Sequence, residues 1–464
     1  MKRPLPSRLA GLSLVLLPLI GSGAHADGEE TRPTIKANRW QEDWSALASP
    51  ALRTEPLDNL KYIPLGSDAW LSLGATLRER LEMNDAANFG TKGTARDNYL
   101  LQRFQVHADL HFNEHWRLFT QLEDVRAYDK TTLGGADQNR LDLRLAFLEY
   151  INAFDSGTLK SRVGRQDFAF DLQRFVSSRD GPNVRQSFDA LWADWETTQW
   201  RFIGIVSHPV QYRDDQDFDD TSNNAVRFDM LRVERVVGNN QELSAYYALY
   251  QRDDAQYLDA SGSEERHIVD ARYAGTAANV DWDLEAMLQG GTVGAKDIRA
   301  WAGGSRVGYT FADQPWTPRL GLQLDIASGD SHAGDGRLGT FNPLFPNGYY
   351  FTLAGYTGYS NLIHVKPSLT VKPLPGLSVQ TAIGLLWRQT TDDAVYTQPN
   401  IAVANTAGTG QRWTGAYAQL RTDYAFTANL SGAVEAVHYD AGQTLREAGG
   451  HDSNYLGVEM KFSW

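Results

Sequence analysis

The sequence predicts an all-β fold: a transmembrane antiparallel up-and-down β-barrel of about 18 strands over residues 67–464. Three observations predict this fold. Apolar and polar residues alternate over long segments, the polar positions are largely charged, and short connections alternate with long ones. Because alternation is also typical of a soluble β-sandwich, the other two observations decide between the two folds.

The alternating segments are roughly 10–15 residues long, nearer to the 9–11 residues of a tilted membrane strand than to a soluble strand of about 5–6. In the segment 103–112, for example, Phe104, Val106 and Leu110 alternate with polar or charged residues. Residues 280–289, 319–326 and 456–464 show the same period of two. Each segment therefore has one face suited to lipid and one suited to a polar lumen.

The connections between segments alternate in length along the chain. Short connections are expected near 113–114, 154–157, 198–199, 239–240, 276–278, 313–317, 373–376 and 428–429. Longer loops are expected near 84–97, 129–140, 170–184, 210–223, 253–264, 329–358, 391–411 and 441–452, with a brief ninth loop near 293–297. Outer-membrane barrels have short periplasmic turns, long external loops and an even number of strands, so we expect this location and both termini in the periplasm.

The composition excludes several other classes of protein. With Cys 0, the chain has neither a disulfide framework nor a thiolate metal site, and its net charge of −13 argues against binding nucleic acid. No apolar run beyond the N-terminus is long enough for a transmembrane helix. We expect no cofactor and no metal site among the residues proposed to line the pathway.

The N-terminus has the features of a secretory signal peptide over residues 1–26. Basic residues precede an apolar run at 9–20, and Ala24-His25-Ala26 fits the cleavage rule. Residues 27–66 alternate little, and we expect them to form either a periplasmic tail or a plug that folds into the lumen. The chain ends on an alternating strand with a terminal aromatic, Trp464, which resembles the signal read by the barrel-assembly machinery.

Function is then expected from the residues that line the lumen. Charged side chains must face inward, since Arg or Lys facing lipid at the midplane costs about 2–4 kcal/mol. Alternation places mostly arginine there, and rings of arginine select anions. The candidate pathway residues are Arg78, Arg80, Arg103, Arg117, Arg144, Arg165, Arg252, Arg272, Arg299, Arg319, Arg388 and Arg421. The alternative is that these bases pair with inward Asp and Glu and only stiffen the wall.

Several motifs resemble those of the alginate-export family of outer-membrane porins. They are LGATLRER at 73–80, VGRQDF at 163–168 followed by Arg174, DGPNVR at 180–185, SFD at 187–189, SGD at 328–330, FNPLFP at 341–346, NLI at 361–363 and KPLP at 372–375. The resemblance implies an 18-stranded monomeric porin whose electropositive constriction passes a uronate polymer such as alginate outward. It also implies that Arg144 and Arg165 are constriction bases.

We therefore expect a non-enzymatic, passive channel for carboxylated solutes or polysaccharide, in contact with outer-membrane lipid and lipopolysaccharide. An alternative is uptake of small carboxylates or aromatic acids, which would need loops folded deep into the lumen. A more remote alternative is an outer-membrane hydrolase built on Ser331 and His332, which are adjacent and expected to point apart.

Two loops have further expected roles. The longest loop, 329–358, should not be structureless, and we expect it to fold inward or to cap the mouth of the barrel. The acidic run at 214–220 offers oxygen ligands for Ca²⁺ but lacks the Gly and terminal Glu of an EF-hand loop. A solvated acidic loop that bridges lipopolysaccharide through divalent ions is favoured over a specific Ca²⁺ site.

Overall fold

The computed structural model describes residues 31–91 and 96–464, which form one compact unit from Thr31 to Trp464. The predicted signal peptide, 1–26, lies outside the described residues. Within them, no helix combines the length and the apolar character needed to cross a bilayer.

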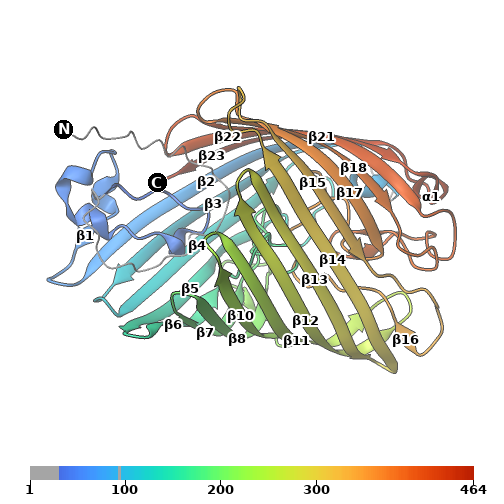
Figure 1. Ribbon diagram of the computed structural model, residues 1–464, viewed down its shortest axis with the longest axis horizontal. Helices are drawn as coiled ribbons and strands as arrows, with labels where there is room; N and C mark the ends of the chain where they lie inside the picture. Colours follow the sequence, from blue (N-terminus) through green and yellow to red (C-terminus); the bar gives the residue numbers. More distant parts are fainter. Residues whose placement is uncertain (1–30, 92–95) are drawn as a thin grey trace. The chain divides into compact units, whose positions relative to one another are not determined.

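The fold is the predicted closed antiparallel barrel of 18 strands (Figure 1). Each barrel strand pairs with the next one along the chain, and the last strand pairs with the first to close the wall. The barrel strands are β2 (Trp70–Asn84), β3 (Asp97–His111), β4 (Trp116–Tyr128), β5 (Asn139–Phe154), β6 (Gly157–Gln166), β7 (Phe188–Glu196), β8 (Trp200–Gln211), β10 (Val226–Val237), β11 (Gln241–Gln256), β12 (Ser261–Ala277), β13 (Val280–Val293), β14 (Lys296–Thr310), β15 (Arg319–Ala327), β17 (Leu362–Val371), β18 (Leu377–Trp387), β21 (Trp413–Ala425), β22 (Leu430–Ala441) and β23 (Ser453–Ser463).

Short strands and short helices lie along the wall and at its ends. The small strands are β1 (Ile63–Pro64), β9 (Thr221–Ser222), β16 (Arg337–Leu338), β19 (Tyr396–Thr397) and β20 (Ile401–Ala402). The helices are the single turns η1 (Arg39–Gln41), η2 (Ser45–Ala48), η3 (Pro50–Leu52), η4 (Asp58–Leu60) and η5 (Ala87–Gly90), and α1 (Gln443–Glu447). Each short connection is a tight turn between consecutive barrel strands, as the sequence predicts.

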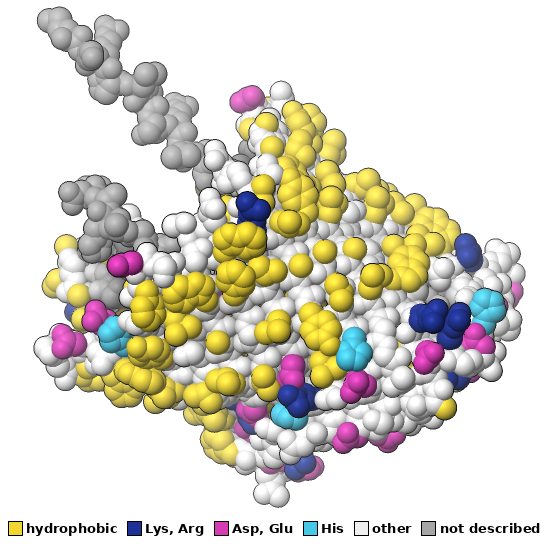
Figure 2. Space-filling model, turned by 60° about the horizontal axis from the view of Figure 1, so that its bottom comes forward, with side chains coloured by type: hydrophobic (Ala, Val, Ile, Leu, Met, Phe, Trp, Pro, Cys, Tyr) yellow, Lys and Arg dark blue, Asp and Glu magenta, His cyan; other side chains and the backbone are white. Residues whose placement is uncertain are grey.

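The alternating pattern separates an apolar outer face from a polar inner face. On β13, Leu284 and Leu288 are exposed, whereas Asp283 and Glu285 are buried inside the barrel. Figure 2 shows hydrophobic side chains spread over the outer face, with charged side chains gathered toward one end. A closed wall leaves no unpaired backbone edge for lipid to solvate, so this geometry suits a bilayer.

Two long connections fold into the barrel and fill much of its interior. The first, residues 167–187 between β6 and β7, is called the first inner loop, and the second, 328–361 between β15 and β17, is called the second inner loop. They meet where Val176 bridges Phe345, whose ring also contacts Phe188 and Phe228 on the wall. The second inner loop includes residues 329–358, the loop that the sequence predicts to fold inward or to cap the mouth.

Glycine on the wall makes room for one anchor of the second inner loop. Gly384 of β18 pairs with Tyr417 of β21, whose ring lies where a Gly384 side chain would project. Tyr417 is buried and donates a hydrogen bond to the carbonyl oxygen of Phe351 at 2.7 Å. The wall therefore fixes the inner loop by an aromatic side chain that covers a glycine.

We predict that Gly384→Ala destabilises the barrel by about 1–3 kcal/mol, because the added methyl group would displace the Tyr417 ring. The urea midpoint of unfolding in detergent measures the effect. Gly303→Ala on β14 is the control, since the nearest atoms to a methyl group there lie 3.8 Å away. Equal midpoints for the two variants would contradict the account of this anchor.

Candidate functional site

Most of the predicted pathway arginines lie on the inner face but are paired with carboxylates of the wall. Arg80 lies 2.6 Å from Glu82 and 2.5 Å from Glu435, and Arg117 lies 2.6 Å from Asp109. The same arrangement holds for Arg144 with Asp167, Arg165 with Asp189, Arg272 with Asp171 and Asp283, Arg319 with Asp281, and Arg421 with Asp423 and Glu435. These pairs satisfy buried charges, so the arginines that they include present little uncompensated charge to a solute.

One group of bases is different, because four cations face a single carboxylate from the first inner loop. Arg103 Nη1 lies 2.8 Å from Asp180 Oδ1, and Arg185 Nε lies 3.4 Å from the same oxygen. Arg78 donates to the Asp180 carbonyl oxygen at 3.0 Å, and the positive charge of Lys461 also acts on the Asp180 carboxylate. We call these five residues the constriction cluster.

Asp180 is accessible to water although it is surrounded by residues of the inner wall. Its side chain is 51% exposed, whereas those of Arg78, Arg103 and Arg185 are almost fully buried. Open space therefore remains inside the barrel beside this carboxylate. The guanidinium groups of Arg103 and Arg185 lie beside it.

Two arginines of the constriction cluster have N–H groups that donate no hydrogen bond within the described part of the chain. Within the described residues, the Nε atoms of Arg78 and Arg185 are buried and have no hydrogen-bond partner. Weaker second contacts reach Glu459, 3.9 Å from Arg78, and Asp167, 3.7 Å from Arg185. A planar guanidinium fork pairs well with a carboxylate, so a solute carboxylate could exchange with that of Asp180.

The first inner loop is fixed to the wall beside this space by Asn183. The Asn183 side chain is buried and donates to the carbonyl oxygens of Gln102, Arg126 and Asp137 at 2.9–3.2 Å. Its Oδ1 accepts a hydrogen bond from Arg78 at 3.0 Å. Since one side chain joins β3, β4 and the following loop, the position of Asp180 is well defined.

The N-terminal segment inserts a tryptophan into the barrel from the side of the short turns. The Trp40 Nε1 donates to Asp167 at 2.6 Å, and the Arg162 guanidinium lies 4.0 Å from the centroid of the Trp40 ring. The neighbouring Arg39 donates to the Trp464 carbonyl oxygen at 2.7 Å, beside the closure between β2 and β23. The segment is thus attached both inside the lumen and at the end of the wall.

One predicted pathway residue on a strand does not lie on the face that the alternation suggested. Arg299 is exposed on the outer face of β14 with Trp301, while Ile298 and Ala300 take the inner face, so its assignment to the lumen is wrong. The reason is its place near the loop end of the strand, where an outward Arg costs only about 0–1 kcal/mol. Arg252, on the side of the buried Tyr250, is exposed near the loop end of β11.

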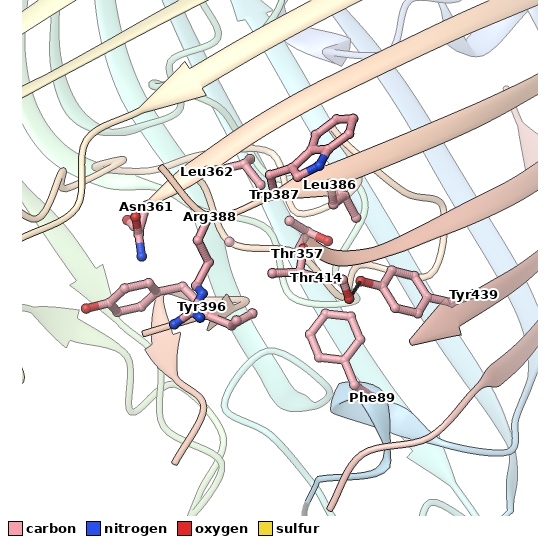
Figure 3. Close-up of a pocket in the computed structure, with 13 residues that line it drawn as sticks. Phe89, Thr357, Asn361, Leu362, Leu386, Trp387, Arg388, Tyr396, Thr414 and Tyr439 are labelled. Atoms are coloured by element: carbon pink, nitrogen blue, oxygen red, sulfur yellow. Dashed lines mark hydrogen bonds between the residues drawn. The ribbon is translucent and has the colours of Figure 1, made fainter. Parts of the chain in front are cut away.

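Arg388 follows β18 and is a structural clamp, so its assignment to the lumen wall is also wrong (Figure 3). Its guanidinium donates to backbone carbonyl oxygens of its own loop, those of Thr391, Asp393, Thr409 and Gln411, at 2.6–3.2 Å. Five donors in a fixed fork suit this task, because a loop without regular structure leaves many carbonyl groups to satisfy. Tyr396 and Asn361 lie beside the clamp in the same pocket (Figure 3).

The pair considered for a hydrolase, Ser331 and His332, lies exposed in the second inner loop. Contrary to the expectation that the two point apart, Ser331 Oγ lies 3.1 Å from His332 Nδ1. The adjacent acid, Asp330, accepts the backbone N–H of His332 at 3.3 Å, so its carboxylate does not orient the ring. Among the residues that the structure describes, no carboxylate is placed against the His332 ring, as a Ser–His–acid arrangement needs.

Several charged residues inside the barrel escaped the analysis of alternation because loops carry them. Arg174, Asp180 and Arg185 all belong to the first inner loop. Alternation says nothing about loops, but the motif DGPNVR at 180–185 contained the signal. Arg232 and Arg266 lie on the inner face and were also missed, and both are paired with carboxylates of the wall.

Comparison with known proteins supports the fold and the family resemblance. The alginate-export family matches residues 69–459, whereas no curated protein matches the sequence. Among solved structures, OccAB1 of Acinetobacter baumannii is similar at a TM-score of 0.58 and 12% identity, with 85% of this chain and 96% of that chain covered. OpdO of Pseudomonas aeruginosa has a TM-score of 0.57 and 13% identity, covering 85% and 97%.

A third similar structure is OccK2 (OpdF) of Pseudomonas aeruginosa, described in complex with glucuronate. It has a TM-score of 0.55 and 14% identity, and covers 85% of this chain and 98% of its own. At these identities the likeness shows the fold alone. Together with the family match, this fold confirms the predicted location in the bacterial outer membrane.

We predict that Asp180→Asn makes the channel more selective for anions. Loss of the one central carboxylate leaves four cations, and the change in Coulomb energy corresponds to about three- to tenfold tighter binding of a carboxylate. The reversal potential across a salt gradient and block by glucuronate measure the effect. Asp215→Asn, in an exposed loop, changes the same charge as a control, and an equal shift in both variants would contradict a local role for Asp180.

Proposed function

The chain belongs to the alginate-export family, and from this premise we propose that it is a passive channel for small solutes that carry a carboxylate, such as a monomeric sugar acid. The observation that carries the proposal is the constriction cluster. There, one half-exposed carboxylate faces four cations in a lumen where most other bases are paired. A solute carboxylate has the charge and shape to take the place of Asp180.

Crowding by the inner loops favours a small solute over a polymer. The interior between the wall and the two inner loops is packed with aromatic side chains, among them Phe175, Phe341, Phe345 and Tyr359. Arg174 of the first inner loop donates to the Tyr350 hydroxyl of the second at 2.7 Å, which ties the loops together. A polymer would have to displace this packing, whereas a small anion needs only the space beside Asp180.

One further observation is consistent with this choice. The complex of OccK2 (OpdF) with glucuronate shows that a barrel of this fold holds a sugar acid. Export of alginate is the second candidate, because the family is named for it. No catalytic step is proposed, since no carboxylate in the described part of the chain orients the His332 ring.

We also propose that residues 31–62 close the periplasmic side of the pathway. Trp40 is held in the lumen by Asp167, Arg162 and the edge of Phe147. Outside, Trp44 and Leu47 pack on Trp70 at the start of the wall. A solute that passes the constriction cluster then meets Trp40, so movement of this segment would gate the flow.

The proposed solute class predicts that glucuronate enters proteoliposomes faster than glucose, a neutral sugar of the same size. Swelling of vesicles in isosmotic solutions of the two solutes measures the rates. Long oligouronates should neither permeate nor block rapidly, because the inner loops fill the lumen. Equal rates for glucuronate and glucose would contradict selection by charge, and passage of the oligouronates would favour polymer export.

The proposed gate predicts that Trp40→Ala raises the single-channel conductance. The substitution removes a hydrogen bond, a cation–π contact and an aromatic contact, together about 2–4 kcal/mol of docking. Trp116→Ala removes an exposed tryptophan at the same end of the barrel and is the control. An unchanged conductance in Trp40→Ala would rule out a gating role for the segment.

A further inference from the structure

Three carboxylates converge where the loop between β8 and β10 folds back onto β5. Asp142 of β5 and Asp219 and Asp220 of this loop each offer an oxygen, and these oxygens lie within 4.8 Å of one another. The loop is attached there by its backbone. The N–H of Asp220 donates to Asp142 at 3.0 Å, and the N–H of Phe218 donates to the Leu141 carbonyl oxygen at 3.0 Å.

The acidic run 214–220 therefore does not behave as one solvated loop. Asp215 and Asp217 are exposed, as expected for such a loop. Asp219 and Asp220 instead turn toward the barrel and meet Asp142, which is only 4% exposed. Sequence spacing could not reveal this group, because its third carboxylate comes from a strand far away in the chain.

A buried amide beside the carboxylates provides a second, independent observation. The Asn139 side chain is 4% exposed and its Nδ2 donates to Asp220 Oδ2 at 2.8 Å. Within the part of the chain that the structure describes, Asn139 Oδ1 has no hydrogen-bond partner, and neither has the buried Asp219 Oδ1. A buried oxygen without a partner costs about 1–3 kcal/mol, so an ordered water or a cation is expected beside each of these atoms.

A half-turn of the Asn139 carboxamide exchanges its oxygen and nitrogen without changing its shape. The oxygen would then face Asp220 Oδ2, an arrangement that is repulsive unless a cation lies between the two. With a cation present, the amide oxygen and the three carboxylates all become ligands. The cation would then be the partner of the Asn139 and Asp219 oxygens, while the Asn139 Nδ2 takes the place that Oδ1 now occupies.

The protein supplies too little positive charge for these carboxylates. Arg165 donates to the Asp220 carbonyl oxygen at 3.3 Å and lies 3.8 Å from Asp142 Oδ1. Its Nε, however, pairs with Asp189 at 2.9 Å. The oxygens of Asp142, Asp219 and Asp220, within 4.8 Å of one another, therefore repel one another. A divalent cation would remove this repulsion.

We propose that Asp142, Asp219, Asp220 and the amide oxygen of Asn139 bind one Ca²⁺ ion that holds the 212–225 loop on the wall of the barrel. Only oxygen ligands are offered, and Ca²⁺ accepts six to eight of them in irregular geometry, with water completing the shell. Mg²⁺ demands a near-ideal octahedron and fits a strand-and-loop site less well. The proposal is independent of the solute that the channel carries.

Calorimetric titration of CaCl₂ into the full barrel tests the proposal. The protein is refolded in detergent without lipopolysaccharide, which itself binds divalent ions, and is stripped with a chelator. We expect one Ca²⁺ per chain with a dissociation constant at or below about 1 mM, in the range of extracellular sites. Absence of binding at this concentration, or binding of Mg²⁺ in preference to Ca²⁺, would overturn the proposal.

Matched variants locate the ion. Asp220→Asn and Asn139→Leu should each weaken Ca²⁺ binding by about tenfold or more, whereas Asp217→Asn, an exposed residue of the same run, should leave it unchanged. Retention of the compact, heat-modifiable form in gel electrophoresis shows that each variant is folded. Equal affinities in Asp220→Asn and Asp217→Asn would place the ion elsewhere.

Limited trypsin digestion gives a second readout that does not depend on affinity. Cleavage after the exposed Arg213 should slow several-fold on addition of Ca²⁺ in the unmodified protein, because the ion fixes the loop. The same addition should have no effect in Asp220→Asn. Protection by Ca²⁺ in both proteins would contradict a site at Asp220.

Discussion

The structure depends on one constraint: inside a bilayer, backbone polar groups and charged side chains must be satisfied by the protein itself. Pairing of β2 with both β3 and β23 closes the wall, so the strands meet the first requirement. The second requirement directs charge inward. The apolar residues that remain outside, such as Leu231 and Leu288, are more than 60% exposed.

The charged residues that face inward account for two features: the stiff parts of the wall and the water-accessible part of the lumen. Where carboxylates on neighbouring strands match the arginines, as around Arg80 and Arg117, the wall is neutral and stiff. Where the first inner loop brings Asp180 to Arg78, Arg103 and Arg185, the next carboxylates, Glu459 and Asp167, lie 3.7–3.9 Å away. Positive charge is in excess there and water has access. The same physical rule therefore generates a structural region and a candidate anion site.

Strand positions and connection lengths could be predicted from the sequence, because a period of two and the turn residues are local properties. The inner wall could be predicted in most places for the same reason. Arg299 shows the limit: near the loop end of a strand the environment outside is no longer hydrocarbon, so a charge can face outward. Arg388 shows a second limit of the prediction. It lies just past the end of a strand, where alternation no longer fixes the side-chain direction, and it donates to carbonyl oxygens of its own loop.

The constriction cluster could be predicted only in part. Arg78 and Arg103 follow from alternation, but Asp180 and Arg185 lie on a loop whose path into the barrel is set by tertiary contacts of Asn183. Which arginines lack a matching carboxylate is likewise a property of the assembled wall. Charge counts along a sequence cannot show it.

The most direct test of the central claim is an experimental structure of the barrel with glucuronate bound. The account predicts the sugar carboxylate against Arg78, Arg103 and Arg185, with the Asp180 side chain turned away from Arg103. Glucuronate bound at a paired arginine such as Arg117, with the contact between Asp180 and Arg103 intact, would contradict it.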